Sequence, residues 1–355
     1  MTEKEYIYDR TQEELSELLS NWGEPAFRAK QIWEGLYQQL WGKPEEFSNL
    51  SKELRQRMAD HFSFSHLKTS TSLKSSDGQT SKNLFILPDG QAIETVLMRY
   101  DDRRTVCIST QAGCALGCTF CATGQMGFRR NLTSGEIAEQ VVFFARQLRA
   151  EGDQVTNVVL MGMGEPFHNY DASLKAIDLL NDDSGLNLGA RRFTISTVGL
   201  IPAIKRFTEE KRQIGLAISL HAAEDQLRAS MLPINDRYPI ADLIQACKEY
   251  VDVSGRRITF EWALINDVND SPEQAQKLAN LLEGLNCHVN LIPLNPTQGF
   301  GGKKSTRERV SEFRKILSAK GISCTVRVRR GIDIQAGCGQ LAESKKTKEV
   351  SPSGS

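Results

Sequence analysis

Residues 105–124 read TVCISTQAGCALGCTFCATG, and they place three cysteines in a glycine-containing loop directly after a short apolar strand pattern. Three residues separate Cys114 from Cys118, and two separate Cys118 from Cys121. Three thiolates this close in one loop can hold three irons of a four-iron cubane cluster. Since most such clusters take a fourth cysteine, this loop would leave one iron open to another molecule. The stretch therefore predicts an iron–sulfur cluster at the end of a strand.

The same loop has two other interpretations. A structural zinc site takes four ligands, commonly starting from cysteines two residues apart, and no matching His or Cys pair lies near this loop. Buried thiols without any metal are the remaining alternative. The chain has eight cysteines, and its N-terminal residues do not resemble a signal peptide. These two features favour metal or redox chemistry over a disulfide scaffold. We therefore prefer the cluster, and we assign no role to Cys247, Cys287 and Cys324.

The composition is that of an ordinary globular protein. The chain has 355 residues, 40% hydrophobic and 25% charged, which is enough for one large domain with a smaller appendage. Lysine plus arginine equals aspartate plus glutamate at 44 each, so the net charge argues neither for nor against a nucleic-acid partner. No apolar run approaches the ~20 residues of a membrane span. We expect a cytoplasmic protein with no membrane partner.

Four segments with different patterns follow one another along the chain. Residues 1–63 have helical period, with the capping-box sequence TQEE near their start, and predict a small helical accessory domain. Residues 64–100 carry short β runs and turn residues, and predict a small β subdomain. Residues 101–341 form the main domain, and we expect the polar tail 342–355 to be disordered.

The main domain alternates apolar β runs with segments of helical period. The β runs lie near residues 105–110, 156–161, 193–198, 215–220, 258–264, 288–293 and 324–328. This alternation is typical of βα units around a parallel sheet, and it places the chain in the α/β class.

Candidate ligand-binding residues follow four of these runs, where each strand is expected to end. They are Gly164 and Glu165 after the second run, Ser196 on the third, Ser219, Leu220 and His221 on the fourth, and Asn295 after the sixth. Each of them alone is more often a plain loop residue or a satisfied core residue than a ligand contact. In βα barrels, however, ligand-binding groups gather at the C-terminal ends of the strands. Together the four places predict a ligand site that faces the cysteine loop.

The CxxxCxxC loop resembles the signature of the radical S-adenosylmethionine (SAM) superfamily. In that superfamily a [4Fe-4S] cluster with three cysteine ligands binds SAM at its open iron, and SAM is cleaved to a 5′-deoxyadenosyl radical. The resemblance implies a partial (βα)6 barrel over residues 101–341, with Cys114, Cys118 and Cys121 as the cluster ligands. It also implies that the strand-end residues named above contact SAM.

Longer motifs narrow the resemblance to one family. The segments similar to the RlmN/Cfr family of ribosomal RNA adenine methyltransferases are GCALGCTFCATGQMGFRRNLTSGEI, VVLMGMGEPFHN, the SLH strand end, LIPLNP and RRGIDIQAGCGQLA. They occur in order and cover nearly the whole chain. The family scheme makes Cys338 the carrier of a methyl group from one SAM, while a second SAM in each turnover supplies the radical. It makes Cys107 the thiol that releases the product through a transient disulfide with Cys338, and Glu94 the proton acceptor.

The resemblance also implies partners. The substrates would be an adenine of 23S ribosomal RNA at the peptidyl-transferase centre, methylated at C2, and the adenine beside the anticodon of some transfer RNAs. Methylation at C8 of the ribosomal adenine, as in the Cfr branch, is the nearest alternative. Further implications are a flavodoxin-like low-potential electron donor, a monomeric enzyme, an RNA-docking role for residues 1–63 and an extruded target base.

Two interpretations outside this family remain open at this point. A zinc-dependent RNA-binding protein without catalytic activity would explain the cysteines but would leave the strand-end residues without a purpose. A radical enzyme that acts on a small molecule would explain both features. Stable RNA binding with a steep salt dependence would count against a small-molecule enzyme.

Overall fold

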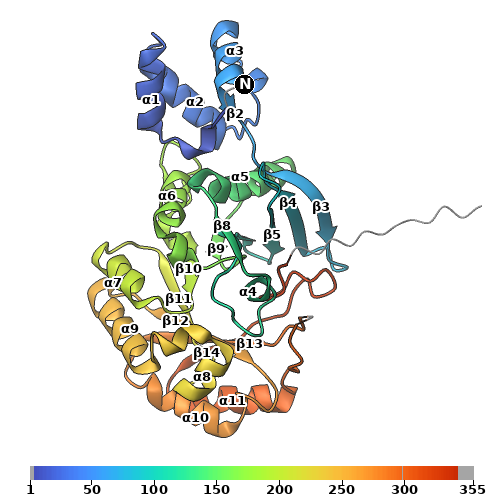
Figure 1. Ribbon diagram of the computed structural model, residues 1–355, viewed down its shortest axis with the longest axis vertical. Coiled ribbons are helices and arrows are strands. Elements are labelled where there is room, and N and C mark those ends of the chain that lie inside the picture. The colour runs from blue at the N-terminus through green and yellow to red at the C-terminus, as the bar shows by residue number, and fades with distance from the viewer. Residues whose placement is uncertain (1–3, 298, 343–355) are drawn as a thin grey trace, which may run out of the picture.

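The computed structural model describes residues 4–297 and 299–342, and one ten-stranded sheet runs through it (Figure 1). In spatial order its strands are β14 (Ser323–Val326), β13 (Cys287–Pro293), β12 (Ile258–Leu264), β11 (Gly215–Ser219), β10 (Phe193–Thr197), β9 (Asn157–Leu160), β6 (Arg104–Cys107), β5 (Ala92–Arg99), β4 (Thr80–Ile86) and β3 (Lys68–Lys74). Neighbours from β14 to β6 pair in parallel, whereas β5, β4 and β3 pair antiparallel. The parallel and antiparallel parts meet where β5 pairs with β6.

The parallel part is the barrel that the sequence predicts. Its strands coincide with the seven predicted β runs, and the helices along this part of the chain are α5 (Ser134–Ala150), α6 (Tyr170–Asn181), α7 (Ile201–Glu209), α8 (Asp225–Met231), α9 (Ile240–Ser254), α10 (Pro272–Leu281) and α11 (Arg307–Ala319). Parallel neighbours need such crossover connections, and the helices lie along the outside of the strands (Figure 1). Strands β6 and β9 to β13 are the six expected strands, and β14 adds a seventh at the edge. The α/β class and the partial barrel are therefore confirmed.

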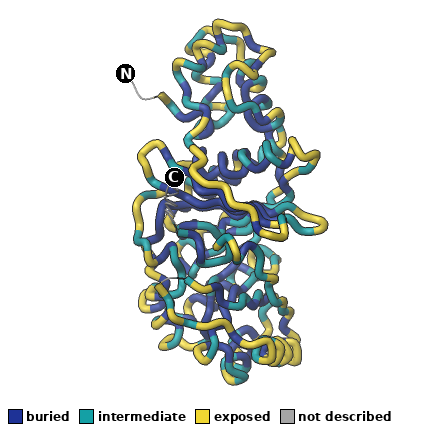
Figure 2. The backbone as a smooth tube through the Cα atoms, turned by 90° about the vertical axis from the view of Figure 1, so that its right-hand side faces the viewer, coloured by how far each residue is buried: buried dark blue, intermediate teal, exposed yellow. Residues whose placement is uncertain are grey.

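Residues 64–100 form three strands that extend the barrel sheet instead of forming a sheet of their own. Val96 of β5 lies opposite Cys107 of β6, and Lys82 of β4 lies opposite Val96. Because residues directly opposite one another share a face, Lys82, Val96 and Cys107 form one row across three strands. Strand β3 is exposed along its length and forms the edge in front of the buried strands in Figure 2.

The N-terminal segment is helical, as predicted, and stands at one end of the molecule in Figure 1. Its elements are β1 (Glu5–Tyr6), α1 (Gln12–Asn21), α2 (Phe27–Tyr37), α3 (Lys52–His61) and β2 (Phe62–Ser63), of which β1 pairs with β2. Thr11 and Glu14 form the predicted capping box at the start of α1. The inward faces of the three helices are apolar, with Leu15, Ile32 and Leu54 at most 2% exposed. The segment thus has a small apolar interior of its own.

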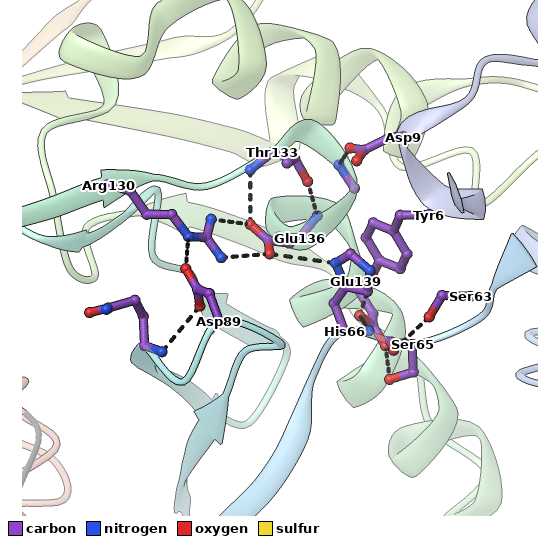
Figure 3. Close-up of polar contacts among 12 residues, drawn as sticks. Tyr6, Asp9, Ser63, Ser65, His66, Asp89, Arg130, Thr133, Glu136 and Glu139 are labelled. Atoms are coloured by element: carbon purple, nitrogen blue, oxygen red, sulfur yellow. Dashed lines mark hydrogen bonds and ion pairs between the residues drawn. The ribbon is translucent and has the colours of Figure 1, made fainter. Parts of the chain in front are cut away.

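A buried carboxylate of α5 attaches this segment to the barrel (Figure 3). Glu139 accepts hydrogen bonds from the hydroxyl of Tyr6, from the hydroxyl of Ser65 at 2.5 Å and from the backbone N–H of His66 at 3.0 Å. All three donors lie outside the barrel sheet, before or after the helices α1 to α3. Together the three hydrogen bonds satisfy the Glu139 carboxylate, and this residue is only 2% exposed. They therefore define how the N-terminal segment is joined to the barrel.

A second carboxylate of α5 links the junction to the cysteine loop. That loop is framed by a hairpin of β7 (Gln111–Gly113) and β8 (Phe128–Asn131), with the short helix α4 (Ala122–Met126) between them. Glu136 accepts two hydrogen bonds from Arg130 of β8 at 2.7 and 2.9 Å, and lies 3.5 Å from Nδ1 of His66 (Figure 3). Burial alone would raise the pKa of the Glu136 carboxyl, but hydrogen bonds from His66, Arg130 and Thr133 lower it to about 2. Glu136 is therefore ionised in the folded protein.

Among residues 4–297 and 299–342, no helix is both long enough and apolar enough to cross a membrane. The predicted disordered tail lies almost wholly outside the described residues, which end at Ala342.

Candidate active site

A cavity of about 160 Å³ lies at the C-terminal ends of the parallel strands. The predicted site residues that line this first cavity are Cys118, Cys121, Gly164, Glu165, Ser196, Ser219, His221, Asn295 and Cys338. They come from the cysteine loop, from the ends of β9, β10, β11 and β13, and from the segment that follows β14. The fold thus brings together residues that are up to 220 positions apart in the sequence.

The three cysteines of the loop lie close enough to influence one another. None forms a disulfide; Cys114 and Cys118 are buried and Cys121 is half-buried. Burial raises the pKa of all three thiols, and the negative charge that each would carry as a thiolate raises those of Cys114 and Cys118 further. Thiolates in this place therefore need a positively charged partner. Iron–sulfur clusters are held by thiolates of this kind, so the donor set fits the predicted cluster.

The loop is not arranged around a single ion. Among the described residues, no three His, Cys, Asp or Glu side chains gather as the ligands of one metal ion. In a cubane cluster each cysteine binds a different iron, so the three sulfurs need not converge on one point.

Two glycines after β9 allow this turn to pack tightly against the strand beside it. A Cβ atom on Gly162 would lie 2.6 Å from the carbonyl oxygen of Ile108, and one on Gly164 would lie 2.6 Å from the side chain of Gln111. Gly164 also has a φ of 101°, which L residues rarely adopt. The sequence predicts Gly164 as a ligand-binding residue; both glycines line the first cavity, but a side chain at either position would face residues 108–111.

Glu165 is fixed by its own backbone surroundings. Its carboxylate accepts hydrogen bonds from the backbone N–H groups of Phe167 and Val198, both at 3.0 Å, and its N–H donates to Gln111 at 2.8 Å. Burial raises the pKa of this carboxyl to about 7 despite these bonds. The side chain is therefore a pre-oriented acceptor whose charge a bound cation would stabilise.

The third and fourth strands contribute hydroxyl groups and an imidazole ring. The hydroxyls of Ser196 and Ser219 lie 3.4 Å apart on neighbouring strands. His221 accepts a hydrogen bond from the N–H of Ala263 at Nδ1, so its Nε2 carries the proton. Burial and the nearby Arg228 guanidinium lower the pKa of His221 to about 3, so the ring is neutral. Leu220 is fully buried and lines neither of the two cavities described here.

Arg228 binds the backbone at these strand ends, and no sequence pattern predicts this role. Its side chain is fully buried and donates to the carbonyl oxygens of Leu220 at 3.1 Å, Ser219 at 3.3 Å and Val198. It also donates to the side-chain oxygen of Asn235 at 3.0 Å. A single buried cation therefore fixes the backbone on which Ser219 and His221 are mounted.

The segment that carries Cys338 packs directly against the cysteine loop. Asn295 donates to the carbonyl oxygen of Cys338 at 3.1 Å, and the backbone N–H of Ala122 donates to that of Gly339 at 2.8 Å. The hydroxyl of Thr123 donates to the carbonyl oxygen of Leu341 at 2.6 Å. These contacts hold Cys338 beside the first cavity.

A second cavity adjoins the first and contains the other predicted thiol. Cys107 and Met98 line it, and Cys338, Asn295 and Arg327 line both cavities. Burial and the neighbouring Cys338 raise the pKa of the Cys107 thiol to about 12. Cys338 thus lies between the loop cysteines on one side and Cys107 on the other.

Glu94 lies outside both cavities. It is 1% exposed, its carboxylate lies 2.9 Å from the ammonium of Lys82, and it accepts the N–H of Ala342 at 3.0 Å. It belongs to the same strand face as Met98, which lines the second cavity. The structure therefore places the predicted proton acceptor close to that cavity but within an ion pair.

Glu261 and Arg327 are charged residues that line the first cavity, and neither was predicted from the sequence. Glu261 of β12 is 4% exposed and accepts from the side chain of Asn290 at 2.9 Å. Its other oxygen has no hydrogen-bond partner within the described part of the chain and lies 4.0 Å from Arg327 Nη1. A carboxylate in the otherwise apolar run ITFEWAL was a signal that could have identified Glu261.

Comparison with known proteins agrees with this geometry. Residues 108–282 match the radical SAM superfamily, and residues 6–63 match the ribosomal RNA large subunit methyltransferase N-terminal domain. A protein of Chloroflexus aurantiacus named "Probable dual-specificity RNA methyltransferase RlmN" is 50% identical over 351 residues, or 96% of this chain and 93% of its own. The "Dual-specificity RNA methyltransferase RlmN 1" of Myxococcus xanthus is 50% identical over 335 residues, or 94% of this chain and 93% of its own.

A solved structure is similar over the same extent. It is the crystal structure of a radical SAM methyltransferase from Sphaerobacter thermophilus, with a TM-score of 0.93 and 51% sequence identity over 95% of this chain and 99% of that one. Membership of the superfamily implies a [4Fe-4S] cluster and SAM. The resemblance inferred from the motifs is confirmed, and the chain belongs to the RlmN family of radical SAM RNA methyltransferases.

Proposed function

We propose that the protein methylates C2 of a specific adenine in 23S ribosomal RNA, and of the adenine beside the anticodon in transfer RNAs, with Cys338 as methyl carrier. The observation that carries this proposal is the position of Cys338 between two cavities. The first cavity also contains the loop cysteines Cys118 and Cys121, and the second also contains Cys107. One thiol is therefore next to both a site for SAM and a second thiol.

The first cavity offers the polar groups that SAM requires. Glu165 is an oriented acceptor for an ammonium group, and Ser196 and Ser219 offer hydroxyls to a ribose or carboxylate. His221 remains neutral because of its burial, and its Nε2–H is a donor. When bound, the cluster and two SAM molecules per turnover supply a methyl group and a radical that removes one hydrogen atom, chemistry that no side chain provides.

The chain's own residues then carry the methyl group to RNA. Cys338 accepts the methyl group on its sulfur, and the carbon that has lost a hydrogen atom bonds to adenine C2, which is not nucleophilic. The adduct loses one electron, and Glu94 takes the proton from that ring carbon, which restores the aromatic ring. The Cys107 thiolate then attacks the sulfur of Cys338, the sulfur–carbon bond breaks, and the released carbon takes up a proton to complete the methyl group on the RNA. A disulfide remains that an external two-electron donor must reduce.

Other parts of the proposal concern partners. Residues 1–63 dock structured RNA and lead the extruded target base to the second cavity. A flavodoxin-like protein supplies low-potential electrons, and the enzyme acts as a monomer. All of these roles rest on the family scheme, and the attachment of the N-terminal segment to α5 supports only the docking role.

The first experiment is anaerobic purification with iron and sulfide analysis, followed by reductant, SAM and ribosomal RNA. We expect about four irons per chain and 2-methyladenine from the native protein, and no methyladenine from Cys338→Ala. Mass spectrometry of digested RNA locates the methyl group. Product solely at C8 would replace the proposed position by that of the Cfr branch, whereas bound zinc with neither 5′-deoxyadenosine nor methyladenine would refute the radical mechanism.

A further inference from the structure

A buried ion pair lies beneath the segment that carries Cys338. The ammonium of Lys82 on β4 is 2.9 Å from the carboxylate of Glu94 on β5, and the two residues are 3% and 1% exposed. A buried ion pair seldom stabilises a fold more than apolar side chains of the same size would. This pair therefore calls for a reason beyond the stability of the sheet.

Each member of the pair also holds one side of the Cys338 segment. Lys82 Nζ donates to the carbonyl oxygen of Gln335 at 3.1 Å, three residues before Cys338. Glu94 accepts the backbone N–H of Ala342 at 3.0 Å, four residues after Cys338. One ion pair thus fixes both ends of the eight-residue stretch 335–342 to the sheet.

The pairing of the strands relates the position of Lys82 to that of Cys107, the second thiol of the proposed reaction. Lys82 lies in the cross-strand row that ends at Cys107, with Val96 between them. The stretch 335–342 is therefore held to β4 and β5 on the same sheet face as Cys107 of β6, and Cys338 is at its centre. On the opposite side of the stretch, Ala122 and Thr123 hold it to the cysteine loop.

We propose that Lys82 is a positioning residue that, together with Glu94, clamps residues 335–342 and thereby holds Cys338 between the two cavities. The role given to Cys338 rests on the proposed function, whereas the clamp itself rests on the contacts above. Lys82 touches neither SAM nor RNA in this proposal. It acts through the backbone of the segment, and its ammonium pairs with the carboxylate of Glu94 that accepts from Ala342.

The test compares Lys82→Met with Lys82→Arg in the cluster-loaded protein. The methionine keeps an unbranched side chain one atom shorter and loses both charge and donors, whereas the guanidinium can still donate to Glu94 and Gln335. Hydrogen exchange read by mass spectrometry reports the protection of residues 331–342. Incubation with SAM and reductant, without RNA, followed by mass analysis of the Cys338 peptide, reports its methylation.

We expect Lys82→Met to speed exchange in residues 331–342, and to slow Cys338 methylation, by roughly 10- to 100-fold, the range expected for a lost charge-assisted hydrogen bond. Iron content and SAM affinity should stay native, which separates loss of position from loss of the fold. Lys82→Arg should restore most of the protection and most of the methylation rate. Lys68→Met on the exposed edge strand β3 is the matched control and should behave as the native protein.

A second variant avoids the buried pair altogether. Ala342→Pro removes the N–H that donates to Glu94 and leaves both members of the buried pair in place. It should loosen the same residues while leaving exchange in β4 and β5 unchanged. The clamp is refuted if both Lys82→Met and Ala342→Pro leave residues 331–342 as protected as in the native protein. If the native protein methylates no RNA while the exchange results are as expected, the clamp stands and the proposed function fails.

Discussion

The side-chain nitrogen of Asn295 lies 3.1 Å from the backbone carbonyl oxygen of Cys338 and donates to it, while the side-chain oxygen of Asn295 accepts from Arg329 at 3.0 Å. Asn295 follows β13, so the strand end itself positions Cys338. We expect Asn295→Ala to slow methylation of Cys338 by roughly 5-fold, the effect of one neutral hydrogen bond of about 1 kcal/mol. The measurement is the rate at which the Cys338 peptide gains a methyl group. Asn286→Ala at an exposed position is the control, and equal rates for the two variants would contradict the expectation.

Removal of the buried guanidinium of Arg228 should destabilise the fold. Arg228→Met would leave the carbonyl oxygens of Val198, Ser219 and Leu220 without this donor in the interior. We expect the free energy of unfolding to fall by about 3 kcal/mol, the cost of unsatisfied buried polar groups. Urea denaturation measures it, and the exposed Arg191→Met should change it by less than about 0.5 kcal/mol. A native midpoint for Arg228→Met would contradict the role given to this residue.

Acid should weaken the junction between the N-terminal segment and the barrel through Glu136. Its pKa is lowered from 4.5 to about 2, so the folded state favours the ionised form more than the unfolded state does. The stabilisation is complete above pH 4.5, and it is lost as the pH falls from 4.5 through 2. A shift of this size corresponds to about 3 kcal/mol.

The variant Glu136→Gln isolates this contribution. The native protein should be about 3 kcal/mol more stable than the variant at pH 7, and the difference should shrink steadily below pH 4.5. Denaturation curves of both proteins across this pH range are the measurement. Glu13→Gln, at an exposed position on α1, should show no such dependence. A difference that is constant with pH would show that the charge of Glu136 does not contribute.

Cys107→Ala should trap the protein on its RNA. Without the second thiol, the bond between the Cys338 sulfur and the methylated adenine has no nucleophile to break it. We expect a covalent complex that survives denaturing electrophoresis and maps to Cys338 after nuclease digestion. Cys324→Ala, which removes a thiol outside both cavities, should release its product normally. Normal turnover by Cys107→Ala would show that Cys107 is not the releasing thiol.

The sequence predicted that the strand-end residues gather in one place because a general rule places them. Glu165, Ser196, Ser219 and His221 come from three strands, and all four line one cavity. Leu220, by contrast, does not line this cavity. It lies between two lining residues, and since neighbouring residues near a strand end point to opposite sides, its side chain belongs to the core.

The remaining features depend on contacts between distant parts of the chain. No local pattern shows that β5 pairs with β6, so the sequence could not reveal that residues 64–100 join the barrel sheet. The role of Arg228 could not be predicted for the same reason, because its partners are mainly backbone carbonyls brought together by the sheet. Glu94 could be recognised only by resemblance, and its pairing with Lys82 follows from strand register alone.

The residues that the clamp joins lie far apart in the sequence, so the ribosome synthesises them at different times. Lys82 and Gln335 are 253 residues apart, and Glu94 and Ala342 are 248 apart. Domains fold as the ribosome releases the chain from the N-terminus onwards. The strands of the barrel therefore emerge before the segment that closes over them. A chain whose translation stops before Gln335 has the loop cysteines but lacks Cys338, the proposed methyl carrier, so under the proposed mechanism it cannot attach itself to RNA.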